Sequence, residues 1–275
     1  MPDKDKLRQL DEQIARLGSV AVAFSGGADS TLLLARCLAT LGAQHVLAIT
    51  ADSPTLPRSE LAEAQALARE LGARHVLVTT AELDDARFAA NPPDRCFFCK
   101  QELFAHMRQR ADREGYQVLA YGATADDQGD FRPGMRAARE AGAVAPLLEA
   151  ELTKQDVRDL SRQLGLRTWD KPAMACLSSR FPYGTALTTE GLSRVEQAEG
   201  LLRSELGLRQ VRVRDQGAVA RIEVEPQDLA SLVQEPVRSQ VIARLKALGY
   251  IYITLNLEGF RSGNMNDVLV NDSSR

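Results

Sequence analysis

One short segment of the sequence combines the residue types that bind a pyrophosphate group. It follows the valine-rich apolar run of residues 19–24, precedes a helical pattern, and reads Ser25-Gly26-Gly27-Ala28-Asp29-Ser30. Glycines lack a β-carbon, so backbone amides at a helix amino terminus can approach an anion closely, and the flanking serines add hydroxyl donors. We interpret Asp29 as orienting the turn or holding Mg²⁺. The segment lacks the Gly-Lys-Ser/Thr ending of kinase and GTPase phosphate loops, so it belongs to another class of phosphate-binding loop.

The four cysteines are unevenly placed. Cys96 and Cys99, in Cys-Phe-Phe-Cys just before a predicted helix, have a spacing that lets two thiolates reach one metal ion or cluster. A tetrahedral zinc site would need two more ligands, for which Cys176 and His106 are the candidates. A thioredoxin-like redox pair is the alternative, although the motif does not follow a first strand as that fold requires. Cys37 lies among leucines and alanines and is predicted to be a small buried hydrophobe.

Cys176 lies in a proline-marked loop, a type of segment that often carries function. Arg180, four residues further on, supplies a cation that would favour the thiolate. Taken alone, Cys176 fits a packing role equally well.

Two arginines, Arg212 and Arg214, are two residues apart on a predicted strand and therefore point to the same face. Guanidinium groups suit phosphate recognition. The partner strand sends Arg221, Glu223 and Glu225 to one face, and the pattern alone favours a solvated face with cross-strand ion pairs of little energetic worth.

The elements that must position these residues follow an alternating pattern. Predicted strands at 19–24, 46–50, 75–80 and 117–121 alternate with helices at 31–39, 58–71 and 100–113, which predicts a mainly parallel sheet covered on both faces. Thr153 and Asp156 have the spacing of a capping box and open a helix that Gly165 closes.

After the loop around Cys176 the order changes to helix 189–206, strands 211–214 and 219–225, helix 237–248 and strand 250–257. This order suggests a small α+β sandwich of ferredoxin-like character. We therefore predict two domains: residues 1–185, an α/β domain that carries the phosphate-binding segment, and residues 186–275, a smaller α+β domain.

Composition restricts the function classes. The 275 residues are 44% hydrophobic and 26% charged, and no apolar run approaches the ~20 residues of a membrane span. The charged amino terminus lacks the apolar core of a signal peptide, so we expect a cytoplasmic protein with reduced cysteines. The net charge of −3 disfavours nucleic acid as a partner.

The Ser-Gly-Gly-x-Asp-Ser signature after an apolar strand resembles the PP-loop of the adenine-nucleotide α-hydrolase group, which includes NAD synthetase, GMP synthetase, asparagine synthetase and the tRNA thiolases. The resemblance implies a Rossmann-like fold of the HUP type and cleavage of ATP between its α and β phosphates. It also implies that residues 48–53 meet the adenine and that residues 122–127 close over the nucleotide. The implied ATP-binding residues, acting with Mg²⁺, are Ser25, Gly26, Gly27, Asp29 and Ser30.

Almost end to end, the chain resembles the LarE-like ATP-dependent sulfur transferases that make the nickel-pincer nucleotide of lactate racemase. The segments that carry this resemblance are the PP-loop, residues 95–100, residues 174–184 and residues 257–263. It implies adenylation of a carboxylate of pyridinium-3,5-biscarboxylate mononucleotide, followed by replacement of an oxygen by sulfur to give a thiocarboxylate. It further implies a small-molecule nucleotide substrate, a homo-oligomer, and partners among the other enzymes of nickel-pincer biosynthesis. Of the two domains, the resemblance implies an ATP pyrophosphatase function for residues 1–185 and substrate binding and oligomerisation for residues 186–275.

The same resemblance assigns roles to single residues. Cys176 matches the sulfur-handling cysteine, which some members sacrifice and convert to dehydroalanine. Other members hold a four-iron, four-sulfur cluster on three thiolates, and because Cys96, Cys99 and Cys176 are all present, we favour the cluster version. The residues that match those holding the substrate's phosphate and lining the site are Arg212, Arg214 and Glu223.

Three other functions compete with this one. A tRNA thiolase can also combine a PP-loop with three cysteines, but the acidic net charge and the lack of an RNA-binding appendage disfavour it. An amide-forming synthetase of the NAD or GMP type would leave the three cysteines without a task. A non-catalytic ATP- or metal-sensing module would bind ATP without releasing pyrophosphate.

Overall fold

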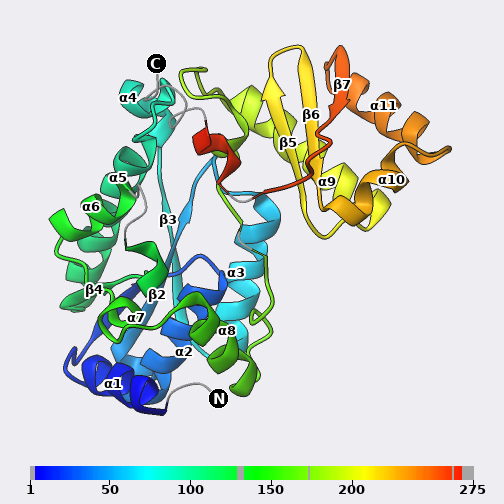
Figure 1. Ribbon diagram of the computed structural model, residues 1–275. Coiled ribbons are helices and arrows are strands. Elements are labelled where there is room, and N and C mark those ends of the chain that lie inside the picture. Colours follow the sequence, from blue (N-terminus) through cyan, green and yellow to red (C-terminus); the bar gives the residue numbers. More distant parts are fainter. Residues whose placement is uncertain (1–3, 129–132, 173, 262, 268–275) are drawn as a thin grey trace. The chain divides into compact units, whose positions relative to one another are not determined.

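The computed structural model describes residues 4–128, 133–172, 174–261 and 263–267 (Figure 1). By its contacts the chain divides into two compact units, Met1–Phe88 with Pro93–Met174 and Ala89–Pro92 with Ala175–Arg275. The sequence-based boundary, 185/186, falls eleven residues later than this one, 174/175. Residues 175–185 group with the second unit because the 3-10 turn η4 (Leu177–Arg180) packs against helix α9 (Thr189–Leu206) and strand β5 (Val211–Gln216).

The first unit is built on a four-stranded parallel sheet, as the alternating pattern predicted. Its order is β3-β2-β1-β4, with bounds β1 Val20–Ala23, β2 Val46–Asp52, β3 Arg74–Thr79 and β4 Val118–Ala120. The chain winds from β1 toward β3 and then returns to the other side of β1 with β4. In such sheets the crevice at the carboxyl ends of the two strands where the winding reverses is the usual ligand site.

Alternation along the strands sends side chains to two cores, one on each face of the sheet. On one face, Val20 and Val22 pack with helices α1 (Lys4–Ala15), α2 (Ala28–Leu41), α3 (Arg58–Glu70), α7 (Pro146–Glu149) and α8 (Lys154–Gln163). On the other, Ala21 and Leu47 pack with α5 (Arg95–Glu114) and α6 (Pro133–Glu140). Figure 1 shows the two helical layers on either side of the strands. The prediction of a sheet covered on both faces is confirmed.

Two predicted helix starts can be compared with the structure, one marked by a capping box and one without a strong capping signal. The capping box is confirmed, because the Asp156 N–H donates to Thr153 Oγ1 at 3.1 Å and the Thr153 N–H donates to Asp156 Oδ2 at 2.9 Å. Gly165 follows the helix with φ +69°. The predicted start of the third helix at Lys100 is wrong. Helix α5 begins at Arg95 with Asp94 as its N-cap residue, so the Cys-Phe-Phe-Cys motif forms its first turn.

The second unit has a three-stranded mixed sheet in the order β5-β6-β7. Strand β6 (Val219–Val224) is antiparallel to β5 and parallel to β7 (Tyr252–Leu255), and helix α11 (Val237–Ala247) supplies the crossover. With α9 and the short α10 (Leu229–Leu232), the order of long elements is as predicted. Residues from α9, α11 and all three strands form its core.

Short elements complete the fold: α4 (Ala86–Ala89), η1 (Ala43–His45), η2 (Glu82–Asp84), η3 (Ala125–Asp127), η5 (Pro226–Asp228) and η6 (Asn264–Asn266). Ser262, in the segment 257–263, lies outside the described residues. Among the described helices, none combines the length and the apolar character that a membrane crossing requires.

Candidate active site

The segment Ser25–Ser30 forms the turn from β1 into α2, as its pattern predicted. Its own hydroxyls hold the turn: Ser30 Oγ accepts from the Ser25 N–H at 3.2 Å and donates to the Gly27 carbonyl at 3.2 Å, while the Gly27 N–H donates to Ser25 Oγ at 3.3 Å. Gly26 has φ +69°, and a β-carbon there would lie 3.1 Å from the Ala64 Cα. The turn therefore requires glycine for both its conformation and its space.

Helix α2 presents its amino terminus at this turn. Its N-cap residue, Gly27, supplies no side-chain hydrogen bond, and Asp29 lies in the first helical turn. The positive end of the helix dipole and the first-turn amides favour a bound anion. This geometry suits a pyrophosphate group.

The loop after β4 comes into direct contact with the same helix start. A β-carbon on Gly122 would lie 3.0 Å from the Ser30 nitrogen, so only glycine allows the two backbones this close. The loop is anchored beyond Gly122, because the Ala125 N–H donates to the Leu152 carbonyl at 2.8 Å and Asp126 Oδ2 accepts from the Lys154 N–H at 2.6 Å. The structure thus brings Gly122, at the start of the segment 122–127, to the phosphate turn at the crevice between β1 and β4.

The carboxyl end of β2 is also fixed by side chains. The hydroxyls of Ser53 and Thr55 both donate to Glu82 Oε1, the Thr55 bond measuring 3.0 Å, and Glu82 is buried. Of the segment 48–53 expected to meet adenine, Ala48 and Ile49 lie in the two sheet cores. These two side chains are therefore not available to a nucleotide.

Cys96 and Cys99 lie one turn apart on α5, Cys96 exposed and Cys99 half-buried. Side chains three apart on a helix are neighbours, so two thiols occupy one side of the helix start. His106 does not fit as a further ligand, because seven helical residues past Cys99 place it about 10 Å along the axis. Among the residues that the structure describes, no three His, Cys, Asp or Glu side chains gather at metal-binding range.

The remaining free cysteine of the first unit, Cys37, behaves as predicted. It is fully buried in the core, and burial raises the pKa of its thiol to about 12. It has the character of a small hydrophobe and offers no thiolate.

Cys176 is half-buried and immediately precedes η4. Its carbonyl accepts from the Ser179 N–H at 3.0 Å and from Arg180 Nη1 at 3.0 Å. The Arg180 guanidinium is fully buried and pairs with both oxygens of Glu199, at 2.8 and 2.9 Å. Among its described bonds, then, Arg180 fixes the backbone of Cys176, whereas the sequence suggested a cation for the thiolate.

Arg212, Arg214 and Glu223 are all buried, so the interpretation of a solvated face is wrong. Arg214 Nε and Nη2 donate to Glu223 Oε2 at 2.9 and 2.7 Å, and Arg214 Nη1 donates to the Ser179 carbonyl at 2.6 Å. Asn264 closes the arrangement, with Oδ1 accepting from Arg214 at 2.7 Å and Nδ2 donating to Glu223 Oε1 at 3.1 Å. Coverage by η4 and by Asn264, both distant in sequence, removes these side chains from water.

Positive charge exceeds negative charge in this buried cluster. Around two buried glutamates, Glu199 and Glu223, the described residues place three buried arginines, Arg180, Arg212 and Arg214, and two partly exposed ones, Arg203 and Arg221. Burial, and then repulsion from Arg180, lowers the pKa of Arg212 to about 9. Burial alone would raise the pKa of Glu199, but its hydrogen bonds with Arg180 and the arginine charges hold the pKa below its usual value. An anion beside Arg212 would offset the excess charge.

The comparisons with known proteins bear on both units. A family model described as NAD synthase matches residues 5–114, which include the phosphate turn. The pyridinium-3,5-bisthiocarboxylic acid mononucleotide synthase of Lactiplantibacillus plantarum is 42% identical over 253 residues, covering 92% of this chain and 91% of that protein. This chain belongs to the family of that LarE-like synthase. It is accordingly an ATP-dependent enzyme of the PP-loop type.

Two further relatives show how far the likeness extends. An uncharacterized protein of Synechocystis sp. is 44% identical over 266 residues, covering 97% of this chain and 98% of that protein. The NH(3)-dependent NAD(+) synthetase of Chlorobaculum tepidum is 29% identical over 167 residues, which is 58% of each chain.

Nothing in the sequence indicated that one segment of the first predicted domain belongs to the second unit. The segment Ala89–Pro92, which leads toward Cys96, belongs to this unit, where the Asn91 side chain donates to the Pro182 carbonyl at 2.8 Å and the Gly184 N–H donates to the Asn91 carbonyl at 2.9 Å. Hydrogen bonds thus join the segment Ala89–Pro92, which precedes Cys96 in sequence, to the loop that follows Cys176. The sequence signal for this unusual segment was an asparagine followed by two prolines. In the structure Asn91 has a positive φ of 54°.

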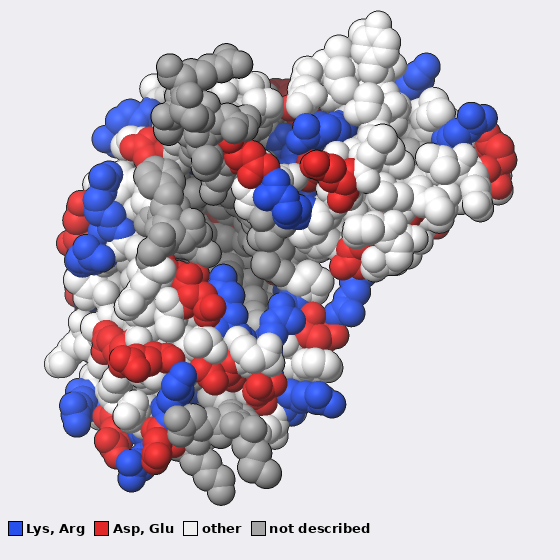
Figure 2. Space-filling model, viewed as in Figure 1, with Lys and Arg blue, Asp and Glu red and all other residues white. Residues whose placement is uncertain are grey.

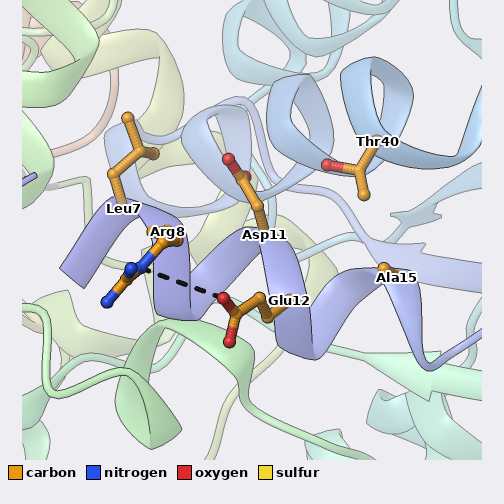
Figure 3. A pocket seen from close by; sticks show the side chains of 6 residues that line it. All are labelled: Leu7, Arg8, Asp11, Glu12, Ala15 and Thr40. Atoms are coloured by element: carbon orange, nitrogen blue, oxygen red, sulfur yellow. Dashed lines mark ion pairs between the residues drawn. The ribbon is translucent and has the colours of Figure 1, made fainter. Parts of the chain in front are cut away.

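A separate hollow lies between α1 and α2, lined by Leu7, Arg8, Asp11, Glu12, Ala15 and Thr40 (Figure 3). Thr40 is near the carboxyl end of α2, whereas the phosphate turn is at its amino end. The hollow therefore lies outside the nucleotide site. Over α1, α2 and α8 the visible face mixes acidic and basic side chains, with no extended basic field among the described residues (Figure 2).

Proposed function

We propose that this enzyme adenylates a carboxylate of pyridinium-3,5-biscarboxylate mononucleotide and that a sulfur nucleophile then displaces AMP from the adenylate, giving a thiocarboxylate for the nickel-pincer cofactor. The kinship with a synthase named for the bisthiocarboxylic product supports the substrate. The observation that carries the proposal is the phosphate turn, held by Ser25 and Ser30 at the start of α2 and approached by Gly122.

The turn's role in the first step follows from its donors. The α2 amino terminus and its serines bind the β and γ phosphates, and Asp29 holds Mg²⁺ or orients the turn. A substrate carboxylate oxygen then bonds to the α phosphorus while the bond from that phosphorus to the bridging oxygen breaks, releasing pyrophosphate. Replacing Asp29 by alanine should abolish pyrophosphate release. Release at the wild-type rate with substrate present would show the assignment of this turn to be wrong.

Substrate recognition is assigned to the buried arginine cluster. Arg212 and Arg214 lie on β5. Glu223 and Asn264 orient the Arg214 guanidinium by accepting three hydrogen bonds from it, and Asn264 also donates one to Glu223. The excess positive charge supports a bound phosphate monoester, since charge-assisted bonds from guanidinium to phosphate are strong and directional.

Sulfur transfer is assigned to Cys176, with Cys96 and Cys99. Thiolates are the ligand type that an iron-sulfur cluster requires, and Cys96 and Cys99 offer two thiols on one side of a helix start. Cys176 would supply the third thiolate. A four-iron, four-sulfur cluster on the three thiolates would supply the transferable sulfide. The bonds of Arg180 and Ser179 to the Cys176 carbonyl hold that residue's backbone, and the hydrogen bonds of Asn91 link the segment before Cys96 to the loop after Cys176.

Two sulfur sources remain to be distinguished, the cluster and the sulfur of Cys176 itself. Under the cluster route, Cys96→Ala or Cys99→Ala removes the iron-dependent absorption and the sulfur transfer, and Cys176 keeps its mass after turnover. Under the sacrificial route, both variants complete one turnover and the protein loses the elements of hydrogen sulfide at Cys176. Intact-mass analysis of anaerobically purified protein separates the two routes.

A further inference from the structure

Lys171, on the segment that follows α8, reaches back to the phosphate turn. Its Nζ lies 3.1 Å from the Gly26 carbonyl oxygen, 2.8 Å from Glu60 Oε2 and 2.8 Å from Glu63 Oε2. Both glutamates belong to α3, and the lysine side chain is mostly buried. An ammonium group has three N–H donors, so each donor of Lys171 has an acceptor within the first unit.

This complete set of partners separates Lys171 from the lysine of a Walker loop. A Walker lysine directs its ammonium at the nucleotide phosphates. Lys171 has all three donors engaged by the protein, and the two carboxylates beside it outweigh its charge. Its effect on a nucleotide must therefore pass through the phosphate turn.

The peptide group between Gly26 and Gly27 connects Lys171 to the phosphate turn. In a trans peptide the C=O and the N–H point in opposite directions, so holding the Gly26 oxygen toward Lys171 turns the Gly27 N–H the other way, where it donates to Ser25 Oγ at 3.3 Å. Glycines at both positions impose little restraint on this peptide plane. Without an anchor the plane could rotate and present a carbonyl dipole to the phosphates.

We propose that Lys171 is a positioning residue that holds the Gly26 carbonyl away from the nucleotide and so keeps the phosphate turn in its anion-binding orientation. The inference rests on the proposed binding of ATP by this turn. It assigns a function to a contact between residues 145 apart in sequence, on a segment that leads toward Cys176.

Lys171→Met tests the proposal because methionine keeps an unbranched stem and removes the three donors. Arg167→Met is the matched control: Arg167 binds the same α3 carboxylate, Glu63, at 3.2 Å, and also Glu70 at 3.0 Å. Both variants lose ion pairs to α3, so both should lower the melting temperature. Only Lys171→Met should raise the KM and Kd for ATP, by about 10-fold or more, as expected for a lost bond to a charged group.

The turnover number supplies a readout that a purely structural role would not give. At saturating ATP the bound phosphates reorder the turn, so the rate of pyrophosphate release by Lys171→Met should stay near the wild-type rate while KM rises. If Lys171→Met does not fold, Lys171→Gln, which cannot satisfy all three acceptors, should show the same rise in KM. A wild-type KM for the folded variant, or an equal rise in Arg167→Met, overturns the proposal. Failure of the wild-type protein to bind ATP would instead overturn the function of the turn.

Discussion

Replacing Arg212 by methionine should separate stability from substrate binding. Burial and the neighbouring arginines lower the pKa of Arg212 to about 9, so the folded protein destabilises the charged guanidinium, and removing that charge can return stability. Methionine retains an apolar stem and carries no charge. We therefore expect the free energy of unfolding at neutral pH to be unchanged or higher, whereas most core substitutions lower it.

The pH dependence of the free energy of unfolding tests the same prediction. Above about pH 9 the unfolded chain, in which Arg212 has its higher ordinary pKa, binds more protons at this residue than the folded chain does, so Arg212 makes wild-type stability rise with pH in the alkaline range. The Arg212→Met variant lacks this contribution. Urea unfolding at several pH values from neutral to alkaline should show the variant's advantage shrinking as the pH rises above about 9.

Substrate binding should change in the opposite direction. Loss of a charge-assisted bond to a phosphate weakens affinity by about 1.5–3 kcal/mol, or roughly 10- to 150-fold, and ATP affinity should not change. Titration calorimetry with the mononucleotide measures the first and with ATP the second. Arg221→Met is the control, because Arg221 lies on the neighbouring strand β6 and carries the same charge but is partly exposed. A variant that is less stable by more than about 2 kcal/mol and binds substrate normally would refute the charge-crowding argument.

Three other substitutions test separate parts of the structure. Gly122→Ala should weaken ATP binding by about 10-fold, since its β-carbon would lie 3.0 Å from the Ser30 nitrogen, and a wild-type Kd would mean that the loop can move aside at little cost. Arg180→Met should lower the free energy of unfolding by about 3–5 kcal/mol because Glu199 is left buried with one partner fewer, and a urea titration showing less than about 1 kcal/mol would contradict this. Glu199 has a lowered pKa in the fold, so its stabilising contribution is present above the unfolded carboxyl pKa and is lost as the pH falls through the lower folded value; Glu199→Gln should flatten the acid limb of the stability curve.

Local signals predicted the elements that position the nucleotide site. The phosphate turn could be placed because strand, glycines and helix are contiguous in sequence, and Thr153 and Asp156 marked a helix start by their spacing alone. The start of α5 was placed too late because no strong capping signal precedes it, Asp94 making no side-chain capping bond.

Nonlocal contacts explain what the sequence did not indicate. The alternation of Arg212 and Arg214 is typical of an exposed strand face, and only the packing of η4 and Asn264 buries it. Lys171 is a similar case, since its three acceptors come from the phosphate turn and from α3. Neither arrangement has a signature in consecutive residues.

The central claim is that one protein both adenylates the substrate and delivers sulfur to it. The most direct measurement incubates anaerobically purified enzyme with ATP, Mg²⁺ and pyridinium-3,5-biscarboxylate mononucleotide, and follows pyrophosphate by enzymatic assay and the nucleotide by mass spectrometry. Our account predicts pyrophosphate release together with a product whose mass reflects sulfur in place of oxygen. It also predicts that Cys176→Ala releases pyrophosphate but forms no thiocarboxylate. Thiocarboxylate formation by Cys176→Ala, or no pyrophosphate from the wild-type enzyme, would contradict it.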